Sequence, residues 1–323
     1  MTADPLSDLL NLVRARCSLS GKLVAGGTWA RRFANLDAIK FCAAIEGHCW
    51  SYVEGMPKPV WFERGDVLVL NGTRSLVLAS DPRLVSGAVT TPHVQDGDGN
   101  YRLGQGDGFT MLGGMVQIDA QRQPLLLGSL GPLIHVNGND PAASNLGWLL
   151  EQIVEEMAPP CRPGHSLVVA ELAQLLFVQT LRAHLSRSSE EKGGWLRGLG
   201  DKRLAPALAG MHAEPARDWS LDDLAREAGM SRTSFAVRFR DVMGMPPLTY
   251  LTNWRMHLAE RDLRAGTAVV EVASAIGYTS ESAFSHAFKR TMGVAPGRYR
   301  KAFGKDASMS EIDRDAKPAD DLF

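Results

Sequence analysis

The chain has 323 residues, enough for about two domains of ordinary size. Hydrophobic residues make up 45% and charged residues 22%, which excludes a chain disordered throughout, a collagen and a small disulfide-rich protein. The formal net charge of −1 neither favours nor excludes a nucleic-acid partner, but residues 202–302 hold 15 Lys and Arg against 10 Asp and Glu. Such a basic segment in a near-neutral chain indicates a region that meets an anion.

The cysteines and the apolar runs indicate the compartment. The four cysteines, Cys17, Cys42, Cys49 and Cys161, form no C-x-x-C pair, so we expect buried, reduced thiols rather than a zinc or redox site. The first residues have no basic stretch followed by an apolar run, and no apolar run reaches about 18 residues. We therefore expect a cytoplasmic protein without a membrane partner.

The first 143 residues are predicted to be a β-domain. Apolar and other residues alternate over residues 39–45, and short apolar runs follow at 60–62, 67–70 and 76–78. Each run ends in turn-forming residues such as Gly65-Asp66 or Asn71-Gly72. Many short strands that recur about every 8–12 residues are typical of a sandwich or a barrel.

Helical periodicity begins near Ser144. Apolar residues recur every three to four positions from Leu146 to Met157, and a second helix is predicted over residues 165–186. The apolar residues of the second helix cover more than one stripe, so it must be covered on more than one side. We therefore predict that residues 144–186 form a homodimer, although both helices could instead pack on the barrel of their own subunit. Residues 186–194 are a predicted interdomain linker.

Everything from residue 195 to about 305 is predicted to be helical, and this segment contains a duplication. Two positions recur after 48 residues and four after 49: Ala225/Ala273, Gly229/Gly277, Phe235/Phe284, Phe239/Phe288, Gly244/Gly293 and Pro247/Pro296. Each copy is a short helix, a glycine-bearing turn and a second helix, which is the pattern of a helix-turn-helix. A single helical hairpin is common, but two matching copies favour DNA binding through the major groove.

Residues 276–290 read IGYTSESAFSHAFKR, and residues 293–300 read GVAPGRYR. With the duplication, these runs resemble the AraC/XylS family of bacterial transcription regulators. The resemblance implies two helix-turn-helix units joined by a rigid helix, here about residues 248–264. Further upstream, GHCW at 47–50, GDVLVL at 65–70, AEL at 170–172, LLF at 175–177 and GWL at 194–196 resemble the family's cupin-like sensor domain.

The expected architecture is α+β. It comprises a cupin-like ligand-sensing barrel over residues 1–143, a helical dimerisation and linker region over 144–194, and an all-α tandem helix-turn-helix domain over 195–305. Residues 306–323 are a predicted disordered tail. The expected function is sequence-specific DNA binding controlled by a small-molecule effector. Double-stranded DNA, that effector, a second copy and RNA polymerase are the candidate partners.

Helical geometry selects the residues that meet DNA, because they must lie opposite the Phe pairs. Short side chains suit thymine methyl groups, polar side chains suit base edges, and basic side chains suit phosphates. The expected base-reading residues are Thr233, Ala236 and Val237 in copy one and Glu281, Ser282, Ser285 and His286 in copy two. The expected phosphate-binding residues are Arg232, Arg240, Lys289 and Arg290. Arg238 lies nearer the core, so we expect it to pack or to hold a phosphate.

A metal-dependent cupin enzyme is the alternative function. Such a site needs His residues close together on one strand and another after a second glycine motif. His48, His93 and His135 are each isolated, and Arg74 or Ser75 stands where the second-motif His would be. We therefore expect no metal, no cofactor and no catalysis, but a ligand cavity in the barrel. Its candidate lining residues are His48, Trp50, Trp61, Arg74 and His93.

Overall fold

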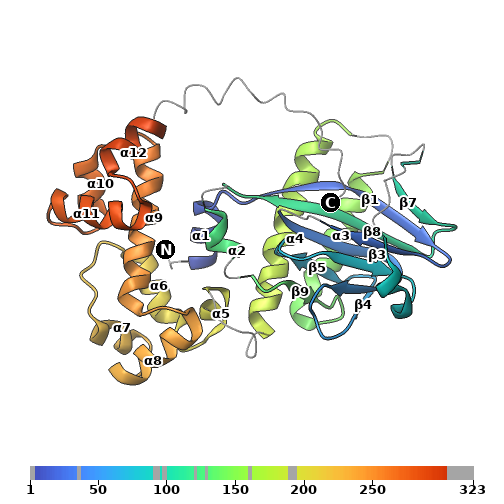
Figure 1. Ribbon diagram of the computed structural model, residues 1–323, viewed down its shortest axis with the longest axis horizontal. Helices are drawn as coiled ribbons and strands as arrows, with labels where there is room; N and C mark the ends of the chain where they lie inside the picture. Colours follow the sequence, from blue (N-terminus) through green and yellow to red (C-terminus); the bar gives the residue numbers. More distant parts are fainter. Residues whose placement is uncertain are drawn as a thin grey trace. The chain divides into compact units, whose positions relative to one another are not determined.

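The structure is a computed structural model, and it describes residues 4–34, 38–89, 95–96, 100–119, 122–127, 130–158, 162–187 and 195–303. The chain divides into two compact units (Figure 1). The N-terminal unit is Val13–Ser188, and the C-terminal unit combines Met1–Leu12 with Ser189–Pro318. The first twelve residues, which are expected in the sensor domain, are grouped with the C-terminal unit by their contacts. The predicted tail at 306–323 and Cys161 lie outside the described residues.

The N-terminal unit is built on one curled sheet with the strand order β2-β6-β3-β8-β1-β7, to which β4, β5 and β9 are added beside β3 and β5. The strands are β1 (Arg16–Gly26), β2 (Ala30–Phe33), β3 (Ile39–Val53), β4 (Val60–Glu63), β5 (Val67–Leu70), β6 (Leu76–Ala79), β7 (Tyr101–Gly104), β8 (Phe109–Gln117) and β9 (Leu133–Val136). Strand β7, which pairs in parallel with β1, falls in a stretch rich in Gly and Asp that carried no strand signal.

Strand β3 organises this sheet. Its first part pairs with β8 on one edge and with β5 on the other, and at Trp50 and Ser51 it pairs with β4 and β6, which therefore lie on opposite edges. A register shift between Ala44 and Glu46 lets the strand bend, so that its two halves belong to different faces of the curl. The inner surface is filled by apolar side chains, among them Trp29, Phe62 and Phe109, which are 7%, 0% and 1% exposed.

Helices complete the N-terminal unit. They are η1 (Pro82–Gly87), α2 (Gln123–Leu127), η2 (Pro141–Ala143), α3 (Ser144–Glu156) and α4 (His165–Arg187). Helices α3 and α4 pack together, and α4 lies against β1 and β9 (Figure 1). The start of β3 is buried on both faces, with Phe41 and Cys42 both nearly inaccessible.

The C-terminal unit is entirely helical in its described part. Its helices are α1 (Pro5–Leu12), α5 (Trp195–Gly200), α6 (Ala205–Ala213), α7 (Leu221–Glu227), α8 (Arg232–Met243), α9 (Pro247–Arg264), α10 (Val269–Ala275), α11 (Glu281–Met292) and α12 (Pro296–Phe303). Copy one is α7 and α8, copy two is α10 and α11, and α9 joins them (Figure 1). Helix α1 packs on α6 and α9 through Leu6, Leu9 and Leu10, a contact that sequence periodicity had not indicated.

Candidate nucleic-acid interface and effector pocket

Local sequence fixes the ends of both second helices. Ser231 and Ser280 cap α8 and α11 by accepting hydrogen bonds from the backbone N–H three residues later. Both helices end at a glycine in the left-handed conformation, Gly244 and Gly293, each with φ of +76°. The two helices therefore begin and end in the same way, as their matched spacing had predicted.

Aromatic rings pack on the buried face of helix α8 in copy one and of helix α11 in copy two. In copy one the rings of Phe235 and Phe239 lie 5.5 Å apart, and Phe239 lies 5.7 Å from Tyr250. In copy two the corresponding distances are 5.6 Å for Phe284 to Phe288 and 5.6 Å for Phe288 to Tyr299. All four phenylalanines are fully buried. The same packing therefore orients α8 and α11 in their two copies.

The opposite faces of α8 and α11 reach solvent. The expected base-reading and phosphate-binding residues are exposed except for Ala236 and Ser285, which are half-buried; the exposed ones are Arg232, Thr233, Val237, Arg240, Glu281, Ser282, His286, Lys289 and Arg290. Arg232 also lies 3.6 Å from Asp222 in an ion pair exposed to solvent. A cleft of about 560 Å³ runs beside α8, with Thr233 and Val237 in its lining.

Arg238 is held by a carboxylate that sequence reasoning had missed. Its Nε and a terminal nitrogen donate to Asp201 Oδ2 at 2.8 and 2.7 Å, and the Asp201 side chain is only 8% exposed. The pair ties α8 to the turn that follows α5. Asp201 stands 37 residues before Arg238, so no local pattern marks it.

Each copy also has a buried polar centre. In copy two, Tyr299 donates to Glu260 Oε1 at 2.6 Å and accepts from Arg264 Nε at 2.9 Å. In copy one, His212 Nε2 lies 2.7 Å from the Tyr250 hydroxyl and its Nδ1 lies 3.2 Å from Asp8 Oδ2.

The protonation of these centres follows from burial and partners. Because an ionised carboxylate only accepts, Nδ1 of a neutral His212 donates to Asp8, and Nε2 accepts from Tyr250. Burial lowers the pKa of His212, while the hydrogen bond to Asp8 acts in the opposite direction. Burial, followed by the hydrogen bond to Glu260, raises the pKa of Tyr299 to about 12.

The expected cavity residues do not line the inside of the barrel. In the β3–β4 pairing, Cys49 and Phe62 face each other and are fully buried, so His48, Trp50 and Trp61 lie on the outer face. There the His48 and Trp61 rings stack at 4.3 Å, and Trp61 meets Trp50 edge-on at 5.1 Å. The sequence could not fix the phase of these strands.

The other two expected cavity residues do not mark an inner site either. Arg74 is exposed and donates to the backbone oxygen of Glu54 at 3.1 Å. His93 lies outside the described residues. In the part of the chain that the structure describes, no group of three or more His, Cys, Asp or Glu side chains could hold a metal ion.

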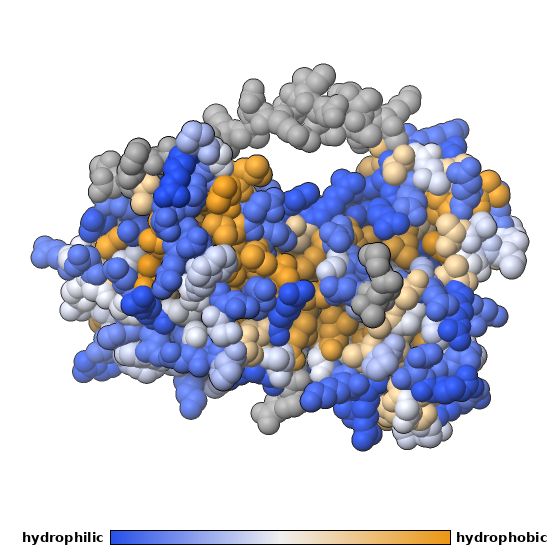
Figure 2. Space-filling view, turned by 180° about the vertical axis from the view of Figure 1, so that it is seen from behind, coloured by the Kyte–Doolittle hydropathy of each residue, from blue (hydrophilic) through white to orange (hydrophobic). Residues whose placement is uncertain are grey.

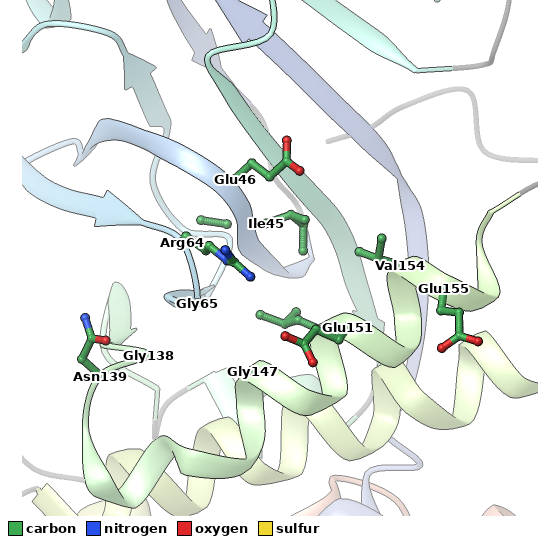
Figure 3. A pocket seen from close by; sticks show the side chains of 12 residues that line it. Ile45, Glu46, Arg64, Gly65, Gly138, Asn139, Gly147, Glu151, Val154 and Glu155 are labelled. Carbon is green, nitrogen blue, oxygen red and sulfur yellow. The ribbon is translucent and has the colours of Figure 1, made fainter.

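A pocket of about 540 Å³ opens elsewhere in the N-terminal unit, between the bend of β3 and helix α3 (Figure 3). Backbone from the β4–β5 turn and from the loop after β9 completes it. Its lining residues are Ala44, Ile45, Glu46, Arg64, Gly65, Gly138, Asn139, Gly147, Leu150, Glu151, Val154 and Glu155. Sequence reasoning assigned none of them to a ligand site, because they come from four separated segments.

A buried Asp-His pair fixes the wall of this pocket. Asp66 is fully buried, and its carboxylate contacts His135 Nε2 at 2.8 Å and accepts from the backbone N–H of Gly138 at 2.9 Å. These bonds join the β4–β5 turn to β9 and the loop that follows it. His135, an isolated His in the sequence, therefore has a structural partner.

Comparison with known proteins matches both units. A cupin family model matches residues 4–186, and a helix-turn-helix domain model matches residues 224–302. A protein named as an AraC-like transcription regulator in Streptomyces lividans is 43% identical over 302 residues, covering 92% of this chain and 98% of its own. The transcriptional regulator MtrA of Neisseria gonorrhoeae is 28% identical over 308 residues, covering 94% and 99%. A solved structure of the AdpA DNA-binding domain with a target DNA is 33% identical, covers 33% of this chain and 96% of that chain, and has a TM-score of 0.32.

Proposed function

The chain belongs to the AraC-like transcription regulators, and from this premise we propose that both helix-turn-helix copies read one DNA duplex under the control of a small-molecule effector. The observation that carries the proposal is the matched pair α8 and α11. Each is anchored by buried aromatic rings and presents its other face to solvent. Two such helices in successive major-groove segments on one side of the duplex lie one helical turn apart, ~34 Å.

The proposed division of contacts follows the chemistry of the exposed faces. Thr233, Ala236 and Val237 meet thymine methyl groups, and Glu281, Ser282, Ser285 and His286 hydrogen-bond base edges. Arg232, Arg240, Lys289 and Arg290 meet phosphates, which position the protein without specifying sequence. Arg238 stays with Asp201 in this scheme.

Salt dependence of DNA binding by the full chain tests the function. Neutralising several phosphates releases counterions, so affinity falls by orders of magnitude as salt rises. Fluorescence anisotropy with a selected duplex and with a scrambled duplex measures both the affinity and its salt slope. A chain that binds neither duplex at low salt contradicts the proposal.

For the N-terminal unit we propose a sensor without catalytic activity, metal or cofactor. The relatives are transcription regulators. The alternative is a cupin enzyme fused to a DNA-binding module, and elemental analysis of the purified chain separates the two. A stoichiometric transition metal that survives dialysis supports the enzyme.

We further propose a homodimer formed through α3 and α4. Apolar surface lies among hydrophilic residues in the view of Figure 2. The exposed large hydrophobic residues of the two helices are Trp148, Val154, Leu167, Val168 and Leu175. Leu167, Val168 and Leu175 lie on one side of α4 by helical spacing, and a contiguous exposed apolar patch favours a protein partner.

The neighbours Leu175 and Leu176 provide a matched test of the dimer. Leu175 is 41% exposed and Leu176 is 1% exposed. Leu175→Glu is therefore expected to give a folded monomer and Leu176→Glu an unfolded domain, as followed by sedimentation and circular dichroism. A wild-type chain that sediments as a monomer at micromolar concentration contradicts the dimer.

The proposed setting is the bacterial cytoplasm, with RNA polymerase as a further partner. Helix α4 is long and apolar enough to cross a membrane by length and composition alone. It packs against α3, β1 and β9 within the N-terminal unit, however, which accounts for the buried part of its apolar surface. Cell fractionation tests the location, and recovery of the chain with washed membranes contradicts it.

A further inference from the structure

The inner surface of the curled sheet leaves little room for an effector. The described side chains that face inward are closely packed, with the Trp29 and Phe109 rings 5.8 Å apart and Phe62 5.9 Å from Phe109. A ligand would have to displace these rings, which costs packing energy. The pocket between β3 and α3 is already open and, at about 540 Å³, falls in the size range of small-molecule sites.

The wall of this pocket is preformed. The bonds of Asp66 to His135 and Gly138 hold the β4–β5 turn against the loop after β9. Gly138 lies so close to Gly65 that a Cβ on Gly138 would clash with the Gly65 backbone. The wall therefore consists of tightly joined backbone, while α3 forms the opposite side. Binding there needs little reordering of the wall, which favours affinity.

The pocket lining carries more negative than positive charge. Arg64 and Glu151 reach into the same space from opposite sides, and Glu46 stands on β3 (Figure 3). Among the described residues these three side chains make no hydrogen bond or ion pair, whereas Glu155 is paired with Arg162 at 3.2 Å. The pocket lining thus carries two uncommitted carboxylates and one uncommitted guanidinium. A ligand that brings positive charge improves this balance.

Apolar side chains supply the rest of the surface. Ile45 comes from the bend of β3, and Leu150 and Val154 come from successive turns of α3. An apolar ligand body would cover these side chains and gain affinity in proportion to the apolar surface that it removes from water. The pocket therefore combines an apolar contact area with carboxylates near it.

We propose that this pocket is the effector site and that its ligand is an organic cation with an apolar body. The assignment as effector site rests on the proposed function of the N-terminal unit as a sensor. Glu151 and Glu46 attract the positive head, and Ile45, Leu150 and Val154 contact the apolar body. Because Glu151 belongs to α3, the ligand contacts directly the helical region proposed for dimerisation.

Three probes with the same decyl chain test the ligand class on the full-length protein. They are decyltrimethylammonium, decanoate and decyl maltoside, each titrated by calorimetry below its micelle concentration. The cation is expected to bind at least about tenfold more tightly than the other two, which corresponds to about 1.4 kcal/mol. Equal binding of all three, or preference for decanoate, overturns the proposal.

Variants place the binding in the pocket. Glu151→Gln and Glu46→Gln are each expected to weaken the cation several-fold, and Arg64→Gln to strengthen it. Asp107→Asn in the turn before β8 removes an exposed carboxylate outside the pocket lining and is expected to change nothing. Weakening by Asp107→Asn equal to that by Glu151→Gln indicates a general charge effect and overturns the site.

A steric variant provides an independent test. A Cβ on Gly147 meets no atom within 4 Å, so Gly147→Leu is compatible with the fold and improves helix propensity while filling the pocket. It is expected to abolish binding of the cation and to leave the thermal midpoint of the ligand-free protein unchanged or higher. Undiminished binding by a folded Gly147→Leu variant overturns the site.

DNA binding measured in parallel separates this inference from the proposed function. Saturation with the cation is expected to change the affinity of the wild type for its selected duplex at least several-fold, and that of Gly147→Leu not at all. If the cation binds but DNA affinity is unchanged, the effector role is overturned while the DNA-binding function stands. A chain that binds the cation but no DNA contradicts the proposed function.

Discussion

The two helix-turn-helix copies share their aromatic core but differ in their polar centres. Tyr250 and Tyr299 stand 49 residues apart at matching places, and the residues they meet, His212 and Glu260, stand 48 apart. In copy two the polar centre contains an ion pair within α9, between Arg264 and Glu260 at 3.2 Å. In copy one the corresponding group is the neutral imidazole of His212, which contacts Asp8 of α1.

The two copies have kept the same aromatic rings, but they differ in the polar groups beneath those rings. The rings that orient the recognition helices occur in both copies, so their loss is expected to affect both equally. The polar groups beneath them diverged, and copy one came to depend on a residue 204 positions away. In copy two Glu260 and Arg264 come from α9 and Tyr299 from α12, so we expect the stability of this centre to be local.

Removing the carboxylate of copy two tests this locality with the largest effect. Glu260 is 3% exposed, and Glu260→Ala removes the carboxylate that Arg264, whose side chain is 15% exposed, contacts at 3.2 Å. We expect a loss of about 3–5 kcal/mol in the free energy of unfolding. Hydrogen exchange read by mass spectrometry should show the loss in α10 to α12.

Phe239→Ala and Phe288→Ala are the matched controls, each with an expected loss of about 3–5 kcal/mol in its own copy. A Glu260→Ala variant that loosens α7 and α8 as much as α10 and α11 breaks the comparison.

The next effect concerns DNA rather than stability. Copy two exposes more hydrogen-bonding groups than copy one, so His286→Ala is expected to cost about 1–3 kcal/mol at the selected site and to relax preference at one or two base pairs. Lys289→Ala is expected to weaken all sequences alike and to lower the salt slope by about one.

Binding-site selection from random DNA, carried out with both variants and the wild type, measures the base preference at each position of the site. An unchanged motif for His286→Ala means that copy two holds the backbone only.

Asp8→Ala is expected to have a smaller effect, confined to copy one. It removes one hydrogen bond to His212 at a carboxylate whose side chain is 41% exposed, so the expected loss is about 1 kcal/mol. Hydrogen exchange in α6 and α9 should rise while α11 and α12 stay protected. Ser7→Ala, a neighbouring change on the exposed side of α1, serves as the control. Loosening of α11 equal to that of α6 would contradict the assignment of Asp8 to copy one.

Acid sensitivity is the smallest expected effect. Burial lowers the pKa of His212 below its ordinary value of 6.5, so the unfolded chain takes up this proton at a higher pH than the native chain does. Stability is therefore lost as pH falls below about 6.5 and is insensitive to this group above it. Denaturant titrations of the wild type and of His212→Gln across this range measure the effect. A wild-type curve that parallels that of His212→Gln excludes His212 as the source.

Regular spacing explains how much of this molecule could be predicted. The Phe pairs, the glycines and the capping serines recur at fixed intervals, so the helices of both copies and the joining helix could be placed from sequence. Residues that meet only through the tertiary fold could not, as with Asp8 and His212, Asp201 and Arg238, or Asp66 and His135. For α1 a signal existed, because Leu6, Leu9 and Leu10 follow helical spacing behind Asp4, which accepts from Ser7. The inner and outer faces of β3 and β4 carried no such signal.

The place of α1 has a consequence for the gene. A reading frame that starts at Ser189 encodes a DNA-binding unit that lacks its first helix, since that helix is translated before the whole N-terminal unit. During synthesis, α1 leaves the ribosome long before α6 and α9, the helices on which it packs. Recombination that exchanges sensor units between regulators of this kind must therefore keep both ends of one parent. A chimera joined at a single crossover in the linker would pair an α1 from one parent with α6 and α9 from the other.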